Sequence, residues 1–485
     1  MVPESARAAA AGRTPPMTTA TLETYEDRVI LAQPRWPWRG VDWSLTLVGL
    51  LVYVYVITSY TVPIAQQAMI AALVGVVVQR GRFRMPRPLI WFGLFVLWCA
   101  VGLATTPYPV LVWPEVQILL KLWLIALVAA NALRTRSDIR FFIIFSLACY
   151  ALYPVRGSLV NYYVYGESLM GRAYWGKAAF SNPNDLAALT FLPLAMSVSL
   201  LFSESKRGWV RWAAVVGVGV LPFLILATQS RGAFLSLAVT IALIGVTQGR
   251  RLLRLYRAQR GVTRLVLSVG VILVVIKAAP HGLWDRVAGL KHATSTENLQ
   301  AVDPEGSAEQ RWEIWRVGTS IFAENPITGV GVGAYPLAHW RKMRNALLYT
   351  GEFKGTAVGY RDIHSMYLGL LAETGILGLL LFASVVISTV LIANRARRRC
   401  GRYLPRASFQ LLCLEFGLLP FFLAGIFGSF ERSPFLVLYL VVVWAAAEVT
   451  ETELGALTRG RVSVQPRVYA GSAPAGALHE GRRGR

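Results

Sequence analysis

Long apolar segments recur along most of the chain and constrain its fold more than any other feature. A helix that crosses about 30 Å of hydrocarbon needs roughly 20 apolar residues, and about twelve segments meet this requirement. Hydrophobic residues make up 55% of the chain and charged residues only 15%. The pattern predicts an all-α polytopic membrane protein, with spans near residues 43–60, 63–79, 88–105, 110–133, 138–155, 185–203, 209–228, 231–248, 263–280, 365–393, 407–428 and 434–449.

The basic residues indicate how these segments cross the membrane. The net charge of +23 lies in short runs between apolar segments, so we expect no nucleic-acid partner. Cytoplasmic loops carry an excess of Lys and Arg, and alternate loops of this chain do so, which places both termini in the cytoplasm. The runs begin at Arg80, Arg134, Lys206, Arg250 and Arg395.

This topology divides the chain into regions and leaves two long connections on the outer side. Residues 1–42 and 450–485, rich in small and basic residues, are predicted to be disordered cytoplasmic tails. Residues 43–280 would hold helices 1–9, and residues 365–449 would hold helices 10–12. The outer connections are residues 156–184 and the large loop 281–364. Long loops on the outer side often carry functional residues.

The large outer loop contains its own helix signal. In "SAEQRWEIWRVGTSIFAENP", Ser307 is a predicted N-cap, Gln310 occupies the capping-box position, and "ENP" ends the helix. Its apolar stripe is predicted to comprise Trp312, Ile314, Trp315, Ile321 and Phe322, so we expect an amphipathic helix on the outer membrane face. The glycine-rich "PITGVGVGAYP" follows, and such runs after a helix are usually plain turns.

One arginine within the apolar part of the chain is a candidate for anion binding. Arg231 in "ATQSRGAFLSL" lies in a tight turn on the outer side, where the positive-inside rule disfavours it. An arginine at membrane depth is generally retained for function. The alternative is an interfacial arginine whose side chain extends to the headgroups.

A second candidate is the polar stretch "YRDIH", which runs directly into "MYLGLLAETGILGLLLF". Arg361 and His364 would share a face if the helix began before Arg361, and otherwise His364 would lie in its first turn. A helix N-terminus disfavours imidazolium, so His364 is expected to be neutral near pH 7 and able to accept a proton. A purely structural hydrogen bond is the alternative.

Further candidates for substrate binding are Arg156, Arg172 and Arg311, each of which has nearby acids or lipid phosphates as alternative partners. The sequence contains no Walker-type Gly-Lys motif, no His-rich metal spacing and no acidic pair suited to Mg²⁺. No metal and no cofactor are therefore expected. Basic groups are expected to outnumber acids near the outer surface.

The order of these motifs resembles the O-antigen ligase and O-antigen polymerase superfamily of bacterial envelope glycan enzymes. The resemblance covers roughly residues 180–445 and rests on "SRG", on "R..IW.........NPITGVGVGAY" and on "H.MYLGLLAETGILG". It implies a GT-C-like, metal-independent glycosyltransferase in the cell inner membrane with a site that faces the periplasm. It also implies catalytic roles for His364, Arg231 and Arg361, although Ser365 stands where relatives commonly have Asn.

The implied donor is a glycan on undecaprenyl diphosphate, and the implied acceptor of a ligase is the lipid A-core oligosaccharide. Guanidinium groups suit a diphosphate leaving group, and a neutral histidine suits a general base for the acceptor hydroxyl. Direct attack would invert the anomeric centre. An O-antigen polymerase, a protein O-glycosylation ligase and a non-enzymatic transporter of lipid-linked glycans remain alternatives. Basic residues of "HWRKMRNALLYTGEFKG", which could meet a phosphorylated core, favour the ligase.

Overall fold

Most of the residues that the computed structural model describes are helical. The described residues are 36–40, 84–169, 171–177, 180–204, 208–257, 307–353 and 355–459. Within them, nine helices are long and apolar enough to cross a membrane, and each coincides with a predicted segment. The predicted segments 43–60, 63–79 and 263–280 lie outside the described residues, as do residues 1–35 and 460–485. The all-α polytopic class is confirmed.

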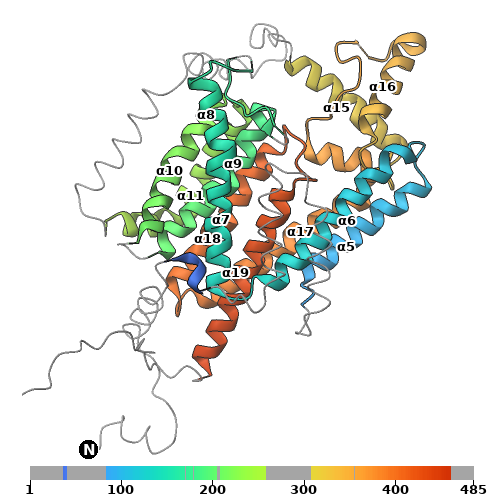
Figure 1. Cartoon of the computed structure of the whole chain (residues 1–485). Coiled ribbons are helices and arrows are strands. Elements are labelled where there is room, and N and C mark those ends of the chain that lie inside the picture. Colours follow the sequence, from blue (N-terminus) through green and yellow to red (C-terminus); the bar gives the residue numbers. More distant parts are fainter. Residues whose placement is uncertain are drawn as a thin grey trace, which may run out of the picture.

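The α-helices are numbered as in Figure 1. They are α5 (Arg87–Val101), α6 (Pro109–Ala132), α7 (Arg136–Tyr150), α8 (Arg156–Tyr163), α9 (Pro183–Ser203), α10 (Trp209–Ala227), α11 (Arg231–Arg257), α15 (Ser307–Glu324), α16 (Tyr335–Asn345), α17 (Met366–Cys400), α18 (Pro405–Ala424) and α19 (Pro434–Thr458). Short π-helical turns occupy Ala151–Val155 and Ala346–Thr350. Short 3₁₀ turns occupy Pro37–Gly40 and Gly102–Ala104.

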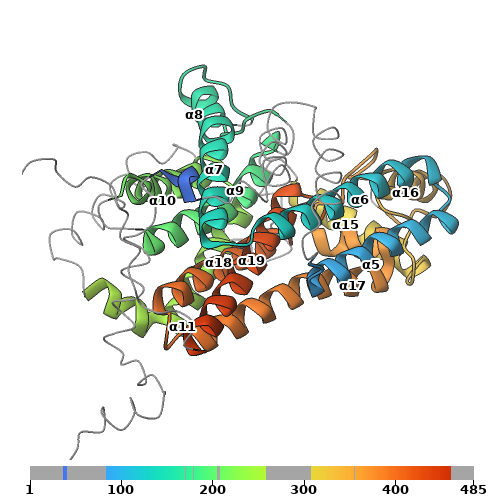
Figure 2. The ribbon, with the colours of Figure 1, turned by 60° about the horizontal axis from the view of Figure 1, so that its bottom comes forward.

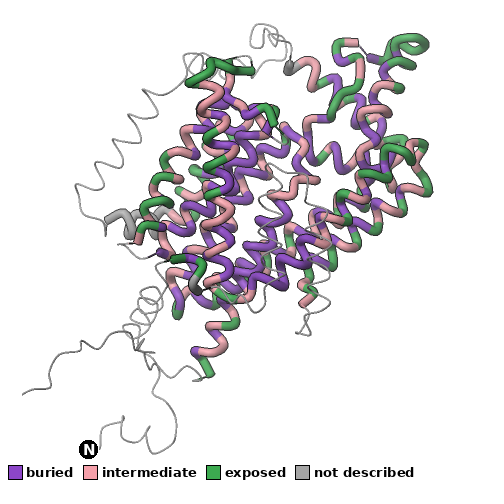
Figure 3. Tube along the Cα trace, viewed as in Figure 1, coloured by how far each residue is buried: buried purple, intermediate pink, exposed green. Residues whose placement is uncertain are grey.

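The helices form one bundle with a smaller helical layer at one end. Helix α9 packs against α10 and α18, while α17 packs against α5 and α19. Figure 1 shows α15 and α16 above the α5–α6 pair, and Figure 2 shows α17 and α5 side by side. Buried residues line the helix contacts, whereas exposed residues gather on outward faces and in loops (Figure 3). The arrangement leaves a polar layer over one end of an apolar bundle.

Two predicted boundaries differ from the structure. Helix α19 continues past residue 449 to Thr458, so the prediction that the C-terminal tail begins at residue 450 is wrong for these residues. The predicted outer connection 156–184 begins with α8, because a π-helical turn joins α7 to α8 without ending the helix. In both places helical hydrogen bonding extends beyond the apolar segment that marked the helix in the sequence.

The described parts of the basic loops near residues 134–140 and 395–406 lie at the end of the bundle opposite α15 and α16, where ion pairs join different helices. Arg397 Nε lies 3.0 Å from a Glu415 carboxylate oxygen, and Arg399 Nη1 lies 3.2 Å from Glu451. A third pair, Arg140 with Glu204, is buried between α7 and α9. The predicted basic loops that the structure describes therefore lie at one end of the folded bundle.

Helix α15 forms where the capping signal predicted it, but its buried face differs from the predicted stripe. Ile314 and Ile321 are buried, as expected, together with Val317. Trp312 is instead 62% exposed, and its neighbour Glu313 is buried. The Glu313 carboxylate accepts hydrogen bonds from the main chain of residues 355 and 357, at 2.8 Å each, so a polar anchor replaces part of the predicted apolar face.

Helix α17 is broken rather than continuous. Gly375 has φ 67° and ψ −174°, which lies outside the helical region. Residues other than glycine rarely adopt a positive φ. A Cβ at this position would also lie 2.0 Å from the Ile327 carbonyl oxygen. Glycine is therefore required here, both by the backbone conformation and by the close approach of a second chain segment.

The glycine-rich segment after α15 completes the hydrogen bonding of the broken helix. The amides of Val330 and Gly331 donate to the carbonyls of Ala372 and Glu373 at 2.9 Å, and the Ile376 amide donates to Pro326 at 2.9 Å. Non-helical backbone at membrane depth is tolerated only where protein or water satisfies it. The segment is thus not a plain surface turn, and its glycines approach the backbone of α17.

Replacing Gly375 with Ala is expected to lower stability by about 1–3 kcal/mol from the strained conformation alone, with a further penalty from the clash. Gly219→Ala is the matched control, because a Cβ at Gly219 in α10 meets nothing within 4 Å. The melting temperatures of the purified variants in detergent measure the difference. Equal melting temperatures for the two variants would contradict this account of the break.

Candidate functional site

The turn between α10 and α11 presents Arg231 at the end of the bundle that carries α15. Gln229 has φ 49°, a left-handed conformation that reverses the chain between the helices. The Ser230 hydroxyl accepts a long hydrogen bond of 3.4 Å from the Ala233 amide, which caps the start of α11. Arg231 follows as the first residue of α11 and is partly exposed. Main-chain amides and a guanidinium group therefore meet at one helix terminus, an arrangement that favours anions.

Arg172 braces this turn. Its Nε donates to the Thr228 carbonyl at 2.8 Å, and its Nη2 donates to Asn184 Oδ1 at 2.6 Å. The Gln229 side chain donates to the Gly171 carbonyl at 2.9 Å, which adds a second link to the same loop. The structure thus gives Arg172 a positioning contact beside Arg231 rather than an open guanidinium group.

The predicted "YRDIH" motif lies between α15 and α17. Ile363 is buried, and its carbonyl accepts a 3.1 Å hydrogen bond from Trp315 Nε1 of α15. A Cβ at Gly318 would lie 2.8 Å from the Ile363 side chain, and one at Gly369 would lie 3.2 Å from it, so these glycines make room for Ile363 between the two helices. Burial of Ile363 holds its neighbours Asp362 and His364 at the surface of the site.

Phe427, in the loop between α18 and α19, connects the two predicted motifs. Its ring stacks with Trp315 at a centroid distance of 6.3 Å. It also lies so close to Gly232 that a Cβ there would be 2.9 Å from the ring. Trp315 in turn holds Ile363. The residues next to Arg231 and His364, far apart in sequence, are thus joined through two aromatic side chains.

His364 lies outside α17, so the prediction that it shares a helical face with Arg361 or occupies the first helical turn is wrong. The N-cap is Ser365, and His364 has φ 51°, a strained conformation of a kind that clusters at functional sites. Burial lowers the pKa of His364, and the positive charges of Arg311 and Arg361 lower it further. The negative charge of Asp362 raises this pKa, but the net shift is downward. The lowered pKa agrees with the expected neutral imidazole, but its main cause is burial and not the helix N-terminus.

Two carboxylates accompany these basic groups. Asp362 Oδ2 lies 3.9 Å from His364 Nδ1. Asp185, in the first turn of α9, interacts electrostatically with Arg311 and with Asp362. The structure therefore gathers Arg311, Arg361, Asp362, His364 and Asp185 from three separate parts of the chain.

The other predicted residues occupy different settings. Arg361 is exposed beside Tyr360, and its charge acts on His364. Arg156 is exposed at the start of α8, and among the described residues no hydrogen bond or ion pair joins it to the cluster around His364. Of the basic stretch predicted to meet a phosphorylated core, Lys342 is paired with Glu324, and Arg341 lies 4.9 Å from the Tyr108 ring centroid.

A charged cluster that sequence analysis did not predict lies behind the site. Arg432, between α18 and α19, faces three carboxylates: Glu115 at 3.1 Å, Glu431 at 3.5 Å and Glu373 at 3.8 Å. Burial raises the pKa of Glu431 to about 7 despite the neighbouring Arg432. Acidic side chains are therefore more prominent at this end of the bundle than predicted.

One signal could have identified this cluster. Glu373 lies in the apolar run "LLAETGILG". An ionisable residue within a predicted span is costly and is generally retained for a reason, as with Arg231. The main chain at Gly333 and Tyr335 hydrogen-bonds to its carboxylate. The sequence alone gave no indication that Arg432 and Glu115 would be its neighbours.

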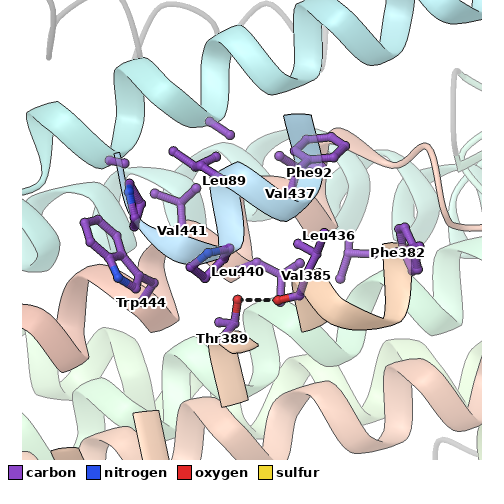
Figure 4. Close-up of a pocket in the computed structure, with 14 residues that line it drawn as sticks. Leu89, Phe92, Phe382, Val385, Thr389, Leu436, Val437, Leu440, Val441 and Trp444 are labelled. Carbon is purple, nitrogen blue, oxygen red and sulfur yellow. Dashed lines mark hydrogen bonds between the residues drawn. The ribbon is translucent and has the colours of Figure 1, made fainter. Parts of the chain in front are cut away.

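An apolar pocket lies deeper in the bundle, between α5, α6, α17 and α19 (Figure 4). Leu89, Phe92, Phe382 and Leu440 are among the residues that line it. The hydroxyl of Thr389, which also lines it, donates to the Val385 carbonyl at 2.8 Å. The pocket suits an apolar chain and offers no titratable group for chemistry.

The Arg432→Met substitution is expected to destabilise the protein by about 3–5 kcal/mol, because it leaves the buried carboxylates of Glu373 and Glu431, and the partly exposed Glu115, without their cation. The matched control is Arg399→Met, which breaks the more exposed pair with Glu451 and should have an effect of about 0–1 kcal/mol. Chemical denaturation followed by tryptophan fluorescence would compare the two. Similar losses of stability would contradict a special role for the Arg432 cluster.

Comparison with known proteins finds similarity in the part of the chain that holds these motifs. A family model described as O-antigen ligase matches residues 216–383. The chain is also similar to the exopolysaccharide production protein ExoQ of Rhizobium meliloti (strain 1021), with 26% identity over 215 residues, 43% of this chain and 45% of ExoQ. The match therefore spans less than half the length of that relative.

The family match covers the second half of α10, α11, α15, α16 and the first part of α17, and so includes Arg231, Arg311, Arg361 and His364. Arg156 and Arg172 lie before it. The matched helices lie within a bundle whose described residues include nine candidate membrane spans. The chain is therefore a multi-pass membrane protein in which residues 216–383 match the family model described as O-antigen ligase.

Proposed function

We propose that this protein is an O-antigen ligase. It would transfer a glycan from undecaprenyl diphosphate to the lipid A-core oligosaccharide, in the inner membrane and at a site facing the periplasm. The observation that carries the proposal is the convergence of Arg231, Arg311 and the Arg361–His364 segment at one end of the bundle. This end is opposite the basic loops, which the positive-inside rule assigns to the cytoplasm.

The arginines suit the leaving group of this reaction. A diphosphate gains negative charge as the bond to the anomeric carbon breaks, and guanidinium groups bind phosphate oxygens through paired hydrogen bonds. Arg231 would act together with the main-chain amides at the start of α11. Arg361, and Arg311 as a substrate-binding residue, would add positive charge from the opposite side of the site.

His364 suits the general base. The acceptor hydroxyl must lose a proton as it attacks the anomeric carbon, and a neutral imidazole can accept it. Burial and the nearby arginines lower the pKa of His364, which keeps the ring neutral at physiological pH. Direct attack in a single step would invert the anomeric configuration. No metal takes part in the proposed mechanism.

A polymerase is the second candidate, and the similarity to an exopolysaccharide production protein favours it. A polymerase of this kind would use a second lipid-linked glycan as its acceptor. A protein O-glycosylation ligase would use a Ser or Thr hydroxyl instead. A non-enzymatic transporter fits the site less well. Transporters bind their substrates near the membrane midplane, whereas the candidate ionisable groups of this site lie toward one end of the bundle.

In a transfer assay with undecaprenyl diphosphate-linked glycan, purified lipid A-core and EDTA, the wild-type protein is expected to form glycan-bearing lipid A-core. His364→Ala should reduce the rate by about 10²–10⁴-fold through loss of the base. Arg231→Ala should reduce it by about 10²–10³-fold through loss of charge stabilisation. The product is measured by gel electrophoresis and mass spectrometry.

Arg316→Ala provides the matched control, because Arg316 is exposed on α15, its guanidinium carbon lies 5.6 Å from the Phe353 ring centroid, and its charge is not among those that shift the pKa of His364. It should retain the wild-type rate. Longer lipid-linked chains in place of modified lipid A-core would favour the polymerase. Binding of the donor without transfer to either lipid acceptor would refute both lipid-acceptor assignments.

The rate should rise with pH through the pKa of His364 and then level off, because only the neutral ring accepts a proton. Asp362→Asn removes the charge that raises this pKa, so the rising limb should move to lower pH. Arg361→Gln removes a charge that lowers it, so the limb should move to higher pH. The dependence of kcat/KM on pH measures both shifts, while Arg311 continues to lower the pKa in each variant. A limb at the same pH in both variants would exclude His364 as the titrating base.

A further inference from the structure

An aromatic stack stands next to the proposed catalytic segment and has no role in the chemistry described above. The rings of Trp340, in α16, and Tyr360 are parallel within 6°, with centroids 5.4 Å apart. The Arg344 guanidinium carbon lies 4.7 Å from the Trp340 ring centroid. Tyr360 is 65% exposed. The stack is therefore ordered by its neighbours while one of its members remains largely accessible.

Buried contacts below the stack fix its position. His339, also in α16, is fully buried, and burial lowers its pKa. The neutral ring can donate from Nδ1 to the Gly359 carbonyl, 3.2 Å away. Gly359 has φ +107°, which turns the chain so that Tyr360 reaches Trp340. The Tyr335 ring lies 5.6 Å from His339, and its hydroxyl donates to Ile314 at 2.9 Å, so the stack is connected to α15.

The stack is close to His364 along the chain. An extended chain spans at most about 3.6 Å per residue, so the Cα atoms of Tyr360 and His364 are separated by no more than about 14 Å. Arg361 is exposed between them. A substrate whose reacting group lay beside His364 would therefore place its adjoining part within reach of the Tyr360 ring.

We propose that Tyr360, supported by Trp340, is a binding platform for a sugar ring of the glycan substrate. The aromatic face of Tyr360 would cover the apolar C–H face of a pyranose. Tyrosine and tryptophan supply rigid contact surfaces with a polar edge, a combination that suits sugars. This assignment rests on the proposed function, since it names the part of the substrate that the same site holds.

The test measures binding without transfer. Two soluble probes are used: the polysaccharide released from the donor by mild acid, and the deacylated lipid A-core oligosaccharide. Saturation-transfer difference NMR titrations would give the Kd of each probe for the detergent-purified full chain. Tyr360→Ala is expected to weaken binding of one probe by about tenfold, which corresponds to ~1.4 kcal/mol. Tyr360→Phe and Tyr360→Trp, which keep the aromatic face, should bind as the wild type does.

Tyr349→Ala is the matched control, because Tyr349 is an exposed aromatic residue at the end of the same helical unit and lies outside the stack. It should bind both probes as the wild type does. Weaker binding of the released polysaccharide alone would assign the platform to the donor, and weaker binding of the core alone would assign it to the acceptor. Unchanged Kd values for both probes in Tyr360→Ala would overturn the proposal.

The His364→Ala variant separates this inference from the proposed function. Because His364 is assigned to proton transfer, its loss should reduce the transfer rate by about 10²–10⁴-fold, whereas Tyr360→Ala should act on the Kd of a probe. If the wild-type protein binds a probe through Tyr360 but transfers no glycan, the ligase assignment fails while the platform stands. Melting temperatures of all Tyr360 variants should equal that of the wild type, because the side chain is exposed.

Discussion

The structure depends on main-chain hydrogen bonding across the break in α17. A helix interrupted at membrane depth leaves amide and carbonyl groups without their helical partners, and each unsatisfied group costs several kcal/mol in hydrocarbon. The segment that follows α15 supplies the missing partners through Val330, Gly331 and Pro326. Trp98 of α5 adds a hydrogen bond to the Thr374 carbonyl at 2.9 Å. The outer helical layer is thereby attached to the bundle through the backbone itself.

This attachment positions the proposed site. Once the glycine-rich segment is fixed against α17, α15 and α16 are held at either end of it, and the "YRDIH" segment can pass between α15 and the start of α17. The Met366 amide donates to the Gly425 carbonyl at 2.8 Å, which joins the same point to the loop after α18. That loop carries Phe427 and Arg432. The attachment of the glycine-rich segment to α17 thus brings together the contacts that surround His364.

The distribution of charge follows from the same arrangement. Carboxylates that would be costly alone in an apolar bundle are grouped around Arg432, where one guanidinium group serves several of them. The more exposed basic groups, Arg231 and Arg361, lie nearer the surface. The end of the bundle therefore combines an internally paired cluster with an outer set of cations suited to an anionic substrate.

The sequence predicted much of this architecture because its signals are local. Long apolar runs predicted the described spans, and alternating basic loops predicted which helix ends lie together. The capping signal at Ser307 and the charge of Arg231 identified α15 and the turn before α11. The apolar stripe of α15 was predicted less well. Tertiary hydrogen bonds bury Glu313, so the buried face of the helix is not purely apolar.

The sequence by itself determined the helical membrane class and the candidate residues, because hydrophobic length and charge alternation act along the chain. Only the tertiary structure decided that α17 breaks at Gly375, that His364 lies before the helix, and that Arg432 joins Glu115 and Glu373. Those features depend on partners from segments distant in sequence. The sequence does not specify such partners locally, because an unpaired amide or carboxylate is stabilised only by the groups that the fold brings to it.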